Sequence, residues 1–193
     1  MQDAVAFDFG PFPVLTTERL ILRALTPADA GDVFVFWGDP EVQRFNAEPS
    51  RDFEETRQFI REMHAAYQAG RSVMWAVAER CDGRVVGAVS LHDWSRRHQR
   101  AEVGYTLARS WWGRGMAYEA VAAVCAFGFD QMGLHRIEAE TIADNHRSVR
   151  LLERLGFQRE GTRREYSLED DGLFHHSAMY GLLDYEYQRP ECL

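Results

Sequence analysis

The chain has 193 residues, of which 46% are hydrophobic and 27% are charged. This composition is typical of a globular protein and excludes a disordered chain. All 22 basic residues are arginine and there are 30 acidic residues, so the formal net charge is −8. An acidic chain has no overall positive field to draw phosphate, which argues against general binding of nucleic acid or anionic membranes.

The cysteines and histidines show no metal-binding pattern. Cys81, Cys125 and Cys192 are far apart, and no Cys/His cluster has zinc spacing. The N-terminal segment lacks the basic start of a signal peptide. The longest uncharged apolar run, residues 120–129, is about half the ~20 residues that a membrane span requires. We therefore expect a cytoplasmic protein without a metal.

The pattern of apolar residues predicts an alternation of strands and helices in one domain. Residues 1–14 read as an irregular arm, and residues 15–193 as a single domain. Thr26-Pro27 has the chemistry of a helix start, and Asp82-Gly83 that of a hairpin turn. Residues 92–100 are expected to form a polar hairpin loop. The expected strands are 15–25, 73–79, 84–91, 101–108, 136–142, 157–166 and 174–185, and the expected helices follow Thr26 and cover 52–69, 116–131 and 145–155.

Chemistry is concentrated in the loop that connects the strand 101–108 to the helix beginning at Met116. Gly113 and Gly115 allow the backbone to turn so that several N–H groups point to one place. The helix N-terminus adds unpaired donors and partial positive charge, which together suit a pyrophosphate. A plain strand-to-helix turn is the alternative. The chain has no lysine and therefore no Walker loop.

This loop and three further segments resemble the GCN5-related N-acetyltransferase (GNAT) superfamily. Trp112-Gly113-Arg114-Gly115-Met116-Ala117 is similar to its Gln/Arg-x-x-Gly-x-Gly/Ala loop. Residues 136–161, with Asn-x-x-Ser and Leu-Gly-Phe, resemble its second half, and TTERLILRAL and HHSAMYGLLDYEY resemble its first and last strands. More narrowly, the chain is similar to the Rim-type branch, the acetyltransferases of ribosomal-protein N-termini. That branch shares the departure at Trp112, which puts one side-chain contact to phosphate in doubt.

The resemblance implies an α/β fold, with a mixed, mostly antiparallel sheet of about seven strands and helices on both faces. It implies acetyl-CoA as co-substrate, with pantetheine lying beside the strand 101–108 and the phosphates on the loop. Because lysine is absent, these phosphates would be met by backbone amides and arginines. Asn145 would contact CoA, cap its helix, or both. The implied CoA-binding residues are Tyr105, Thr106, Leu107, Trp112, Gly113, Arg114, Gly115, Met116, Ala117 and Asn145.

Glu102 is the only charged residue in the expected strand 101–108. A buried carboxylate must be paired or functional, and desolvation raises its pKa toward that of a base working at neutral pH. A salt bridge to an arginine is the alternative; the resemblance favours a base that deprotonates the amine, with Gly104 beside it leaving room for a ligand. Ser148, or water, would protonate the leaving thiolate, because Leu152 stands where many members carry a tyrosine. The alternative is that Ser148 is an ordinary solvent-facing helix serine. Tyr105 is a more distant candidate.

The acceptor is the least determined part of the expected site. Candidate linings are Trp37, Phe45, His92 and Trp94, although buried aromatic residues are more often plain core. The resemblance favours a protein N-terminal amine, and a small amine such as a polyamine, amino acid or antibiotic is the alternative. A CoA-binding regulatory module without turnover is a third interpretation. A homodimer is possible within the family.

Overall fold

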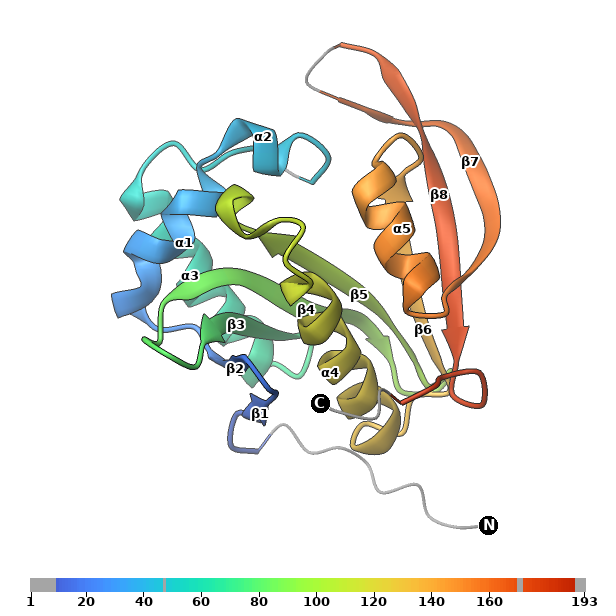
Figure 1. The fold of residues 1–193 in the computed structure, drawn as a ribbon, viewed down its shortest axis with the longest axis horizontal. Helices are drawn as coiled ribbons and strands as arrows, with labels where there is room; N and C mark the ends of the chain where they lie inside the picture. Colours follow the sequence, from blue (N-terminus) through green and yellow to red (C-terminus); the bar gives the residue numbers. More distant parts are fainter. Residues whose placement is uncertain (1–9, 47, 170–171, 190–193) are drawn as a thin grey trace.

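The computed structural model describes residues 10–46, 48–169 and 172–189, and all of its strands belong to one sheet (Figure 1). The strands are β1 (Leu15–Thr16), β2 (Leu20–Ala24), β3 (Val73–Glu79), β4 (Val85–Ser95), β5 (Arg100–Leu107), β6 (Arg136–Ile142), β7 (Gln158–Leu168) and β8 (Phe174–Leu183). The helices are α1 (Ala30–Trp37), α2 (Pro40–Gln43), α3 (Phe53–Gln68), α4 (Met116–Asp130) and α5 (His146–Arg154), with 3-10 turns at Pro27–Asp29 and Arg109–Trp111.

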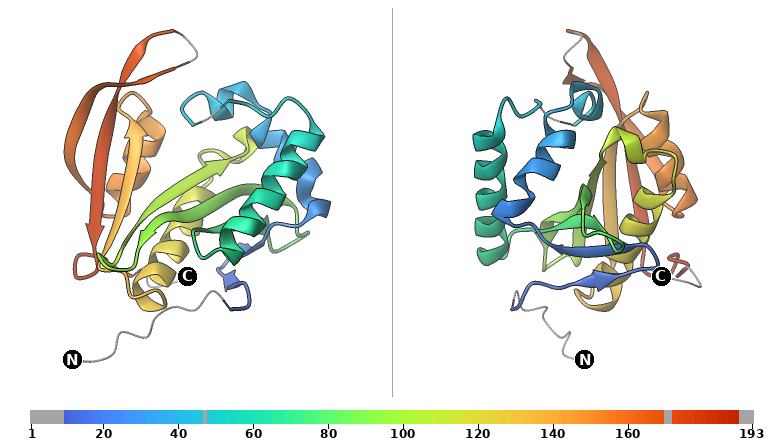
Figure 2. Two further views of the ribbon diagram at one scale, coloured as in Figure 1. Left: turned by 180° about the vertical axis from the view of Figure 1, so that it is seen from behind. Right: turned by 60° about the vertical axis from the view of Figure 1, so that its left-hand side comes forward.

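The strand order is β1-β2-β3-β4-β5-β6-β8-β7, and every neighbouring pair is antiparallel except β5 and β6. Figure 2 shows α1 and α3 on one face of the sheet and α4 and α5 on the other. The expected mixed, mostly antiparallel sheet with helices on both faces is therefore confirmed. No helix among the described residues is long and apolar enough to cross a bilayer.

The sheet has eight strands in the described part of the chain, where about seven were expected. The expected strand 15–25 breaks at residues 17–19, and β1 folds back to pair with β2. The Thr17 hydroxyl stabilises this turn, because it accepts a hydrogen bond from the Leu20 N–H at 3.1 Å. Alternation of Leu and Ile is identical in one long strand and in a short hairpin, so it did not reveal the break.

The polar loop that the sequence predicted over residues 92–100 is shorter in the structure. β4 continues to Ser95 and β5 begins at Arg100, so only residues 96–99 connect them. The register shifts between His92 and Ser95, and Asp93 adopts a left-handed backbone with φ 49°. The polar composition of this segment suggested a loop. The chain instead continues as a strand that contains a β-bulge.

A large hydrophobic core lies between the sheet and α4. The helix is buried on most of its surface, as its composition predicted, and Cys125 within it is fully buried. The described end of the N-terminal arm is tied to this body, because the Trp75 indole N–H donates to the Pro13 carbonyl at 2.8 Å. The Phe12 ring also packs on the Tyr67 ring, with centroids 4.8 Å apart. Residues 1–9 of the expected arm lie outside the described residues.

β5 and β6 open the sheet. They pair only over Arg100–Glu102 and Arg136–Glu138, although β5 continues to Leu107 and β6 to Ile142. Beyond Glu102 the two strands diverge, and the two halves of the sheet separate around the opening (Figure 1). This leaves one edge of β5 unpaired inside the molecule, where edge backbone groups need another partner.

Candidate active site

A cavity of about 620 Å³ occupies the opening between β5 and β6 and extends to the start of α4. Its walls come from α2, β5, the loop after β5, the first turn of α4, the end of β6 and α5. Most of the predicted site residues share it. These are Phe45, Glu102, Tyr105, Thr106, Leu107, Trp112, Gly113, Gly115, Met116, Ala117, Asn145 and Ser148.

The glycine loop has the backbone that its sequence predicted. Gly113 and Gly115 have φ of +74° and +78°, a region that side chains with a Cβ rarely adopt. Gly115 is also the N-cap of α4, so the free N–H groups of the first helical turn begin at the cavity wall. Loop and helix end together provide the amide donors and partial positive charge that suit a phosphate group.

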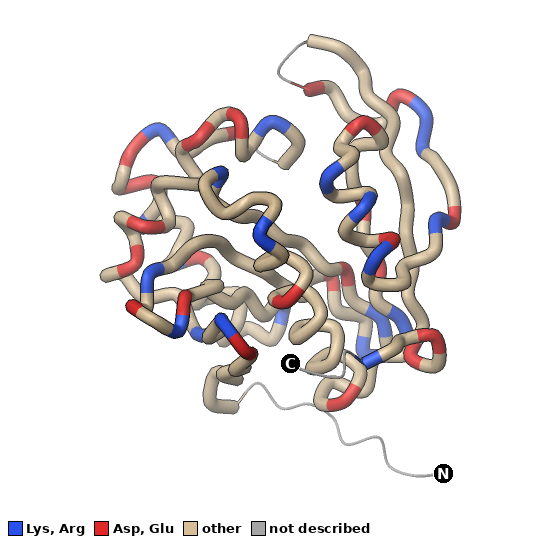
Figure 3. Tube along the Cα trace, in the orientation of Figure 1, with Lys and Arg blue, Asp and Glu red and all other residues tan. Residues whose placement is uncertain are grey.

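Basic side chains surround this loop and are held by aromatic rings. The Arg147 guanidinium lies 4.3 Å from the centroid of the Trp112 ring, and that of Arg154 lies 4.4 Å from Tyr118. Basic positions recur along α5 (Figure 3), and Arg147, Arg150 and Arg154 all line the cavity. The Trp112 indole N–H donates to the Leu107 carbonyl at 2.8 Å. Trp112 therefore joins the loop to the end of β5 while it supports a cation.

The open edge of β5 presents backbone groups to the cavity. Ala108 donates its N–H to the Val86 carbonyl of the neighbouring chain segment. In an antiparallel pair such bonds recur at every second residue, so the N–H and C=O groups of Val103, Tyr105 and Leu107 point away from β4. Of these, the Val103 N–H belongs to the short ladder with β6 and the Leu107 carbonyl accepts from Trp112, which leaves the Val103 carbonyl, both groups of Tyr105 and the Leu107 N–H at the open edge. The Thr106 side-chain oxygen is buried in the same wall and has no hydrogen-bond partner in the described part of the chain. Sequence reasoning named the backbone near Tyr105, Thr106 and Leu107 and missed Val103.

Glu102 is the carboxylate of this wall without an arginine partner among the described residues. The two neighbouring acids on β6 take the nearby arginines: Glu138 pairs with Arg136 at 2.9 Å and Glu140 with Arg163 at 2.9 Å. The side chain that approaches Glu102 is that of His92, whose Nε2 lies 3.9 Å from Glu102 Oε1. The alternative of an arginine salt bridge is therefore not what the structure shows.

Burial raises the pKa of Glu102 above its ordinary value. His92 opposes this rise, and the neighbouring carboxylates Glu140, Asp93 and Glu138 reinforce it. A carboxylate that is partly desolvated and close to other acids takes up a proton more readily, which is what a general base near neutral pH requires.

Ser148 and Tyr105 form a pair that sequence reasoning did not anticipate. Their hydroxyl oxygens lie 2.7 Å apart across the cavity wall. Burial raises the pKa of Tyr105 to about 12, so this phenol keeps its proton at neutral pH. Asn145 caps α5, because its Oδ1 accepts from the Ser148 N–H at 3.3 Å. The capping interpretation of Asn145 is thus confirmed, and Asn145 also faces the cavity.

The remaining predicted site residues lie outside the cavity. Trp37 packs on Phe59 with ring centroids 4.2 Å apart, and Trp94 carries the Arg96 guanidinium on its ring. Arg114 is exposed, with its guanidinium 4.7 Å from the Trp111 centroid. Trp37, Trp94 and Arg114 therefore do not line the cavity.

His92 approaches the site from β4. The ring lies over Gly104, where an added Cβ would come within 3.2 Å of it. A side chain at this position would therefore be tight against His92, and Gly104 itself lines the cavity beside Glu102. His92, Asp93 and Glu102 also bring potential ligand atoms within 4.8 Å of one another.

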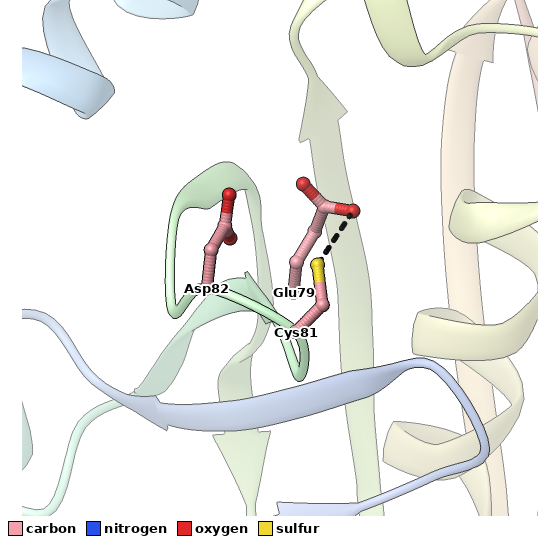
Figure 4. A group of neighbouring side chains, drawn as sticks. All are labelled: Glu79, Cys81 and Asp82. Carbon is pink, nitrogen blue, oxygen red and sulfur yellow. Dashed lines mark hydrogen bonds between the residues drawn. The ribbon is translucent and has the colours of Figure 1, made fainter.

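A second group of potential ligands lies at the turn between β3 and β4. Glu79, Cys81 and Asp82 approach one another there, and the Cys81 thiol donates to the Glu79 carboxylate at 3.7 Å (Figure 4). None of the three lines the cavity. Linear spacing revealed neither group, because the members of each come together through the turn or the sheet register. Cys192 lies outside the described residues.

Comparison with known proteins identifies the class. The family model described as "Acetyltransferase (GNAT) domain" matches residues 19–158, so the chain belongs to the GNAT acetyltransferase family and is an acyltransferase. It is 36% identical over 160 residues to the uncharacterized N-acetyltransferase YoaA of Bacillus subtilis, covering 82% of this chain and 90% of that one.

Rim-type enzymes are among its relatives. The [Ribosomal protein uS5]-alanine N-acetyltransferase of Escherichia coli is 27% identical over 165 residues, covering 81% of this chain and 84% of that one. The structure of Mycobacterium smegmatis RimJ in complex with CoA-disulfide superposes with a TM-score of 0.80 at 22% identity, covering 90% of this chain and 88% of that one. The expected family resemblance is confirmed, and GNAT acetyltransferases use acetyl-CoA.

Proposed function

We propose that this chain transfers the acetyl group of acetyl-CoA to a protein N-terminal amine, through Glu102 and Ser148. The observation that carries the proposal is that one cavity joins the glycine loop, the open edge of β5 and a carboxylate without an arginine partner. Acetyl-CoA supplies an activated acyl group, and an amine must lose its proton before it can attack. A phosphate site and a base therefore have to meet in one place.

The residues present fit the shape and charge of CoA. The amide groups around Gly113 and Gly115 and the arginines of α5 suit its phosphates. The unpaired edge of β5 suits the amide groups of pantetheine, which would add to the sheet as a further strand does. The unpartnered Thr106 hydroxyl offers one more polar contact.

The protein groups would act in three steps. Glu102 removes a proton from the ammonium of the acceptor, directly or through water. N–H groups of the β5 edge donate to the carbonyl oxygen as it gains negative charge. Ser148 gives its proton to the departing thiolate and regains one from Tyr105 or water. The amine nitrogen loses two protons in all. The first, from its ammonium form, goes to Glu102, and the second, released as the new C–N bond replaces the thioester C–S bond, passes through water or the Tyr105–Ser148 pair and replaces the proton taken by the thiolate. CoA leaves as the thiol, and no covalent enzyme intermediate forms.

The acceptor is inferred from the relatives and from the walls of the cavity. The uS5 enzyme acts on a ribosomal-protein alanine, as its name states, which favours a polypeptide N-terminus here. Glu41, Glu102 and Glu140 line the same cavity, and acids attract the ammonium of either a peptide or a small amine. Polyamines, amino acids and aminated antibiotics remain the second candidate class. Membership in an acetyltransferase family favours both classes over a module without turnover.

A panel of amines with acetyl-CoA tests the proposal, with thiol release as the readout. The panel contains short peptides with a free N-terminus, the same peptides with a blocked N-terminus, spermidine, amino acids and aminoglycosides. We expect turnover of free-N-terminus peptides and no turnover of the blocked ones. Turnover of small amines alone would overturn the peptide assignment, and failure to bind CoA would overturn the whole proposal.

A further inference from the structure

The turn between β1 and β2 contacts the first turn of α4. There the buried Glu119 carboxylate accepts three hydrogen bonds from this turn and pairs with the Arg19 guanidinium. The Thr17 hydroxyl donates at 2.5 Å and the Arg19 backbone N–H at 2.8 Å. Arg19 Nε donates to the other carboxylate oxygen at 2.7 Å, and Arg19 Nη2 lies 2.7 Å from the same oxygen in the ion pair. Residues 100 positions apart in the sequence thus form one compact ion pair.

Arg19 also holds the glycine loop. Its Nη1 donates to the Arg114 carbonyl at 2.9 Å, between the two glycines with positive φ. In a trans peptide group the N–H points opposite to the C=O. A hydrogen bond that fixes the Arg114 carbonyl therefore fixes the direction of the Gly115 N–H as well. Gly115 lines the cavity and Arg114 does not, so the peptide group that Arg19 holds borders the cavity.

The geometry points to Arg19, Thr17 and Glu119 as a brace that positions the glycine loop for the pyrophosphate of CoA. The inference rests on the proposed function, and it assigns a role to residues outside the cavity. Arg19 is a positioning residue here, because it acts through the loop backbone. Glu119 anchors Arg19, and Thr17 anchors Glu119.

The charges of the brace agree with this role. A bare carboxylate in the first turn of α4 would repel phosphate, and Arg19 neutralises it. Burial alone would raise the pKa of Glu119, but the hydrogen bonds from Thr17 and Arg19 outweigh it and lower the pKa. Glu119 therefore stays ionised and keeps Arg19 in place at neutral pH. The ideal position of a Cβ on Gly115 lies 3.4 Å from Arg19 Nη2, which shows how closely the guanidinium approaches the loop.

The variant R19Q tests the brace. We expect CoA to bind about tenfold more weakly by calorimetry, the size of one lost hydrogen bond to a charged group. The KM for acetyl-CoA should rise by the same factor, with kcat at saturation nearly unchanged. Acetylpantetheine lacks the pyrophosphate, so its kcat/KM should be the same in R19Q and in the wild-type chain. A purely structural role would lower kcat/KM for both substrates together.

R80Q is the matched control. Arg80 donates to the Thr17 and Glu18 carbonyls of the same turn, each at 3.0 Å, and it approaches from the side of β3. We expect R80Q to lower thermal stability and to leave CoA affinity unchanged. T17V, which removes one donor to Glu119, should weaken CoA binding less than R19Q, and T17S should restore it. T17V keeps the test open if R19Q does not fold.

The outcomes separate this inference from the proposed function. If the wild-type chain binds CoA and R19Q binds it equally well, the brace is wrong and the proposed function stands. The brace is also wrong if R80Q weakens CoA binding as much as R19Q does, or if acetylpantetheine turnover falls in parallel. If the wild-type chain itself does not bind CoA, the proposed function fails first.

Discussion

The raised pKa of Glu102 depends on the ion pairs that the neighbouring residues form. The arginines that would have neutralised it are engaged by Glu138 and Glu140 on the next strand. Its charged form is therefore destabilised by burial and by the nearby acids, with only His92 acting in the opposite direction. A carboxylate left in this way can exchange a proton near neutral pH, whereas one locked to an arginine cannot.

Replacing Glu102 with Gln should lower kcat/KM by about 10²- to 10⁴-fold, the usual contribution of a general base. CoA affinity should be unchanged, because Glu102 lies near the start of β5 and the glycine loop follows the other end of that strand. The wild-type profile of kcat/KM against pH should rise through a pKa above that of an ordinary glutamate. This acidic limb should vanish in E102Q. Steady-state rates across pH and calorimetry with CoA measure both effects; an unchanged limb would contradict the assignment.

The Ser148–Tyr105 pair makes a separate prediction. S148A should lower kcat by about 10²-fold if Ser148 delivers the proton to the thiolate. Y105F removes only the partner at 2.7 Å and should cost about tenfold or less. Because the two hydroxyls act as one unit, the double variant should be no slower than S148A.

Acylation rates with a peptide acceptor measure the Ser148–Tyr105 cycle. Additive losses would show that the two hydroxyls act independently. A normal rate in S148A would assign the proton to water instead.

At the scale of elements, local sequence predicted most of the framework. β3 and β6 have the expected bounds, and α3, with its Asp52 cap, matches the expected helix to within a residue at each end. Errors arose at residues 17–19, where the period-2 pattern continued through a turn, and near Asp93, where polar residues suggested a loop although the strand continues through a bulge. There tertiary contacts decide where a strand stops, and local propensity does not contain them.

In the candidate site too, features with a local sequence signal could be predicted, and contacts between distant segments could not. The glycine loop and Glu102 could be predicted, because backbone freedom and a lone charge in a strand are local signals. The contacts of Tyr105 with Ser148 and of Arg19 with Glu119 join distant segments and carry no local signal. Trp37 and Trp94 do not line the cavity, and the sequence could not show this, because an aromatic residue has the same local signal in a core and in a pocket.

Helix α5 presents its arginines to the cavity, and this arrangement should be measurable as phosphate affinity. R147A removes the cation held over the Trp112 ring, so CoA should bind about three- to tenfold more weakly. The loss should shrink at high salt, since an exposed charge is screened. R61A is the control, because Arg61 lies on α3 at the opposite face of the sheet. Equal losses in both variants would contradict a specific role for α5.

At the scale of the whole molecule, several carboxylates are held ionised by the fold. Burial tends to raise the pKa of Asp29, but hydrogen bonds from Arg23 and Thr26 outweigh it and lower the pKa. The pKa of Glu119 is lowered in the same way by Thr17 and Arg19, and that of Glu160 by hydrogen bonds from Arg136. Each of these groups binds a proton more readily in the unfolded chain than in the folded one.

The free energy of unfolding should therefore depend on pH in one direction. A carboxyl group with a lowered folded-state pKa stabilises the fold fully above its unfolded pKa of about 4, and this contribution is lost as pH falls through the folded pKa. Urea unfolding should thus show less stability at pH 3 than at pH 7.

The variant D29N tests how much of the stability lost at low pH comes from Asp29. It leaves Arg23 without its bidentate partner at 2.8 Å and should lower the free energy of unfolding by about 1–3 kcal/mol at pH 7. The difference from the wild-type chain should shrink as the pH falls below the unfolded pKa of about 4 and through the lowered pKa of Asp29 in the folded chain. E48Q is the control, because Glu48 is exposed and lies 4.0 Å from its nearest arginine. A difference between D29N and the wild-type chain that stays constant with pH would show that Asp29 stabilises the fold by packing and not by its charge.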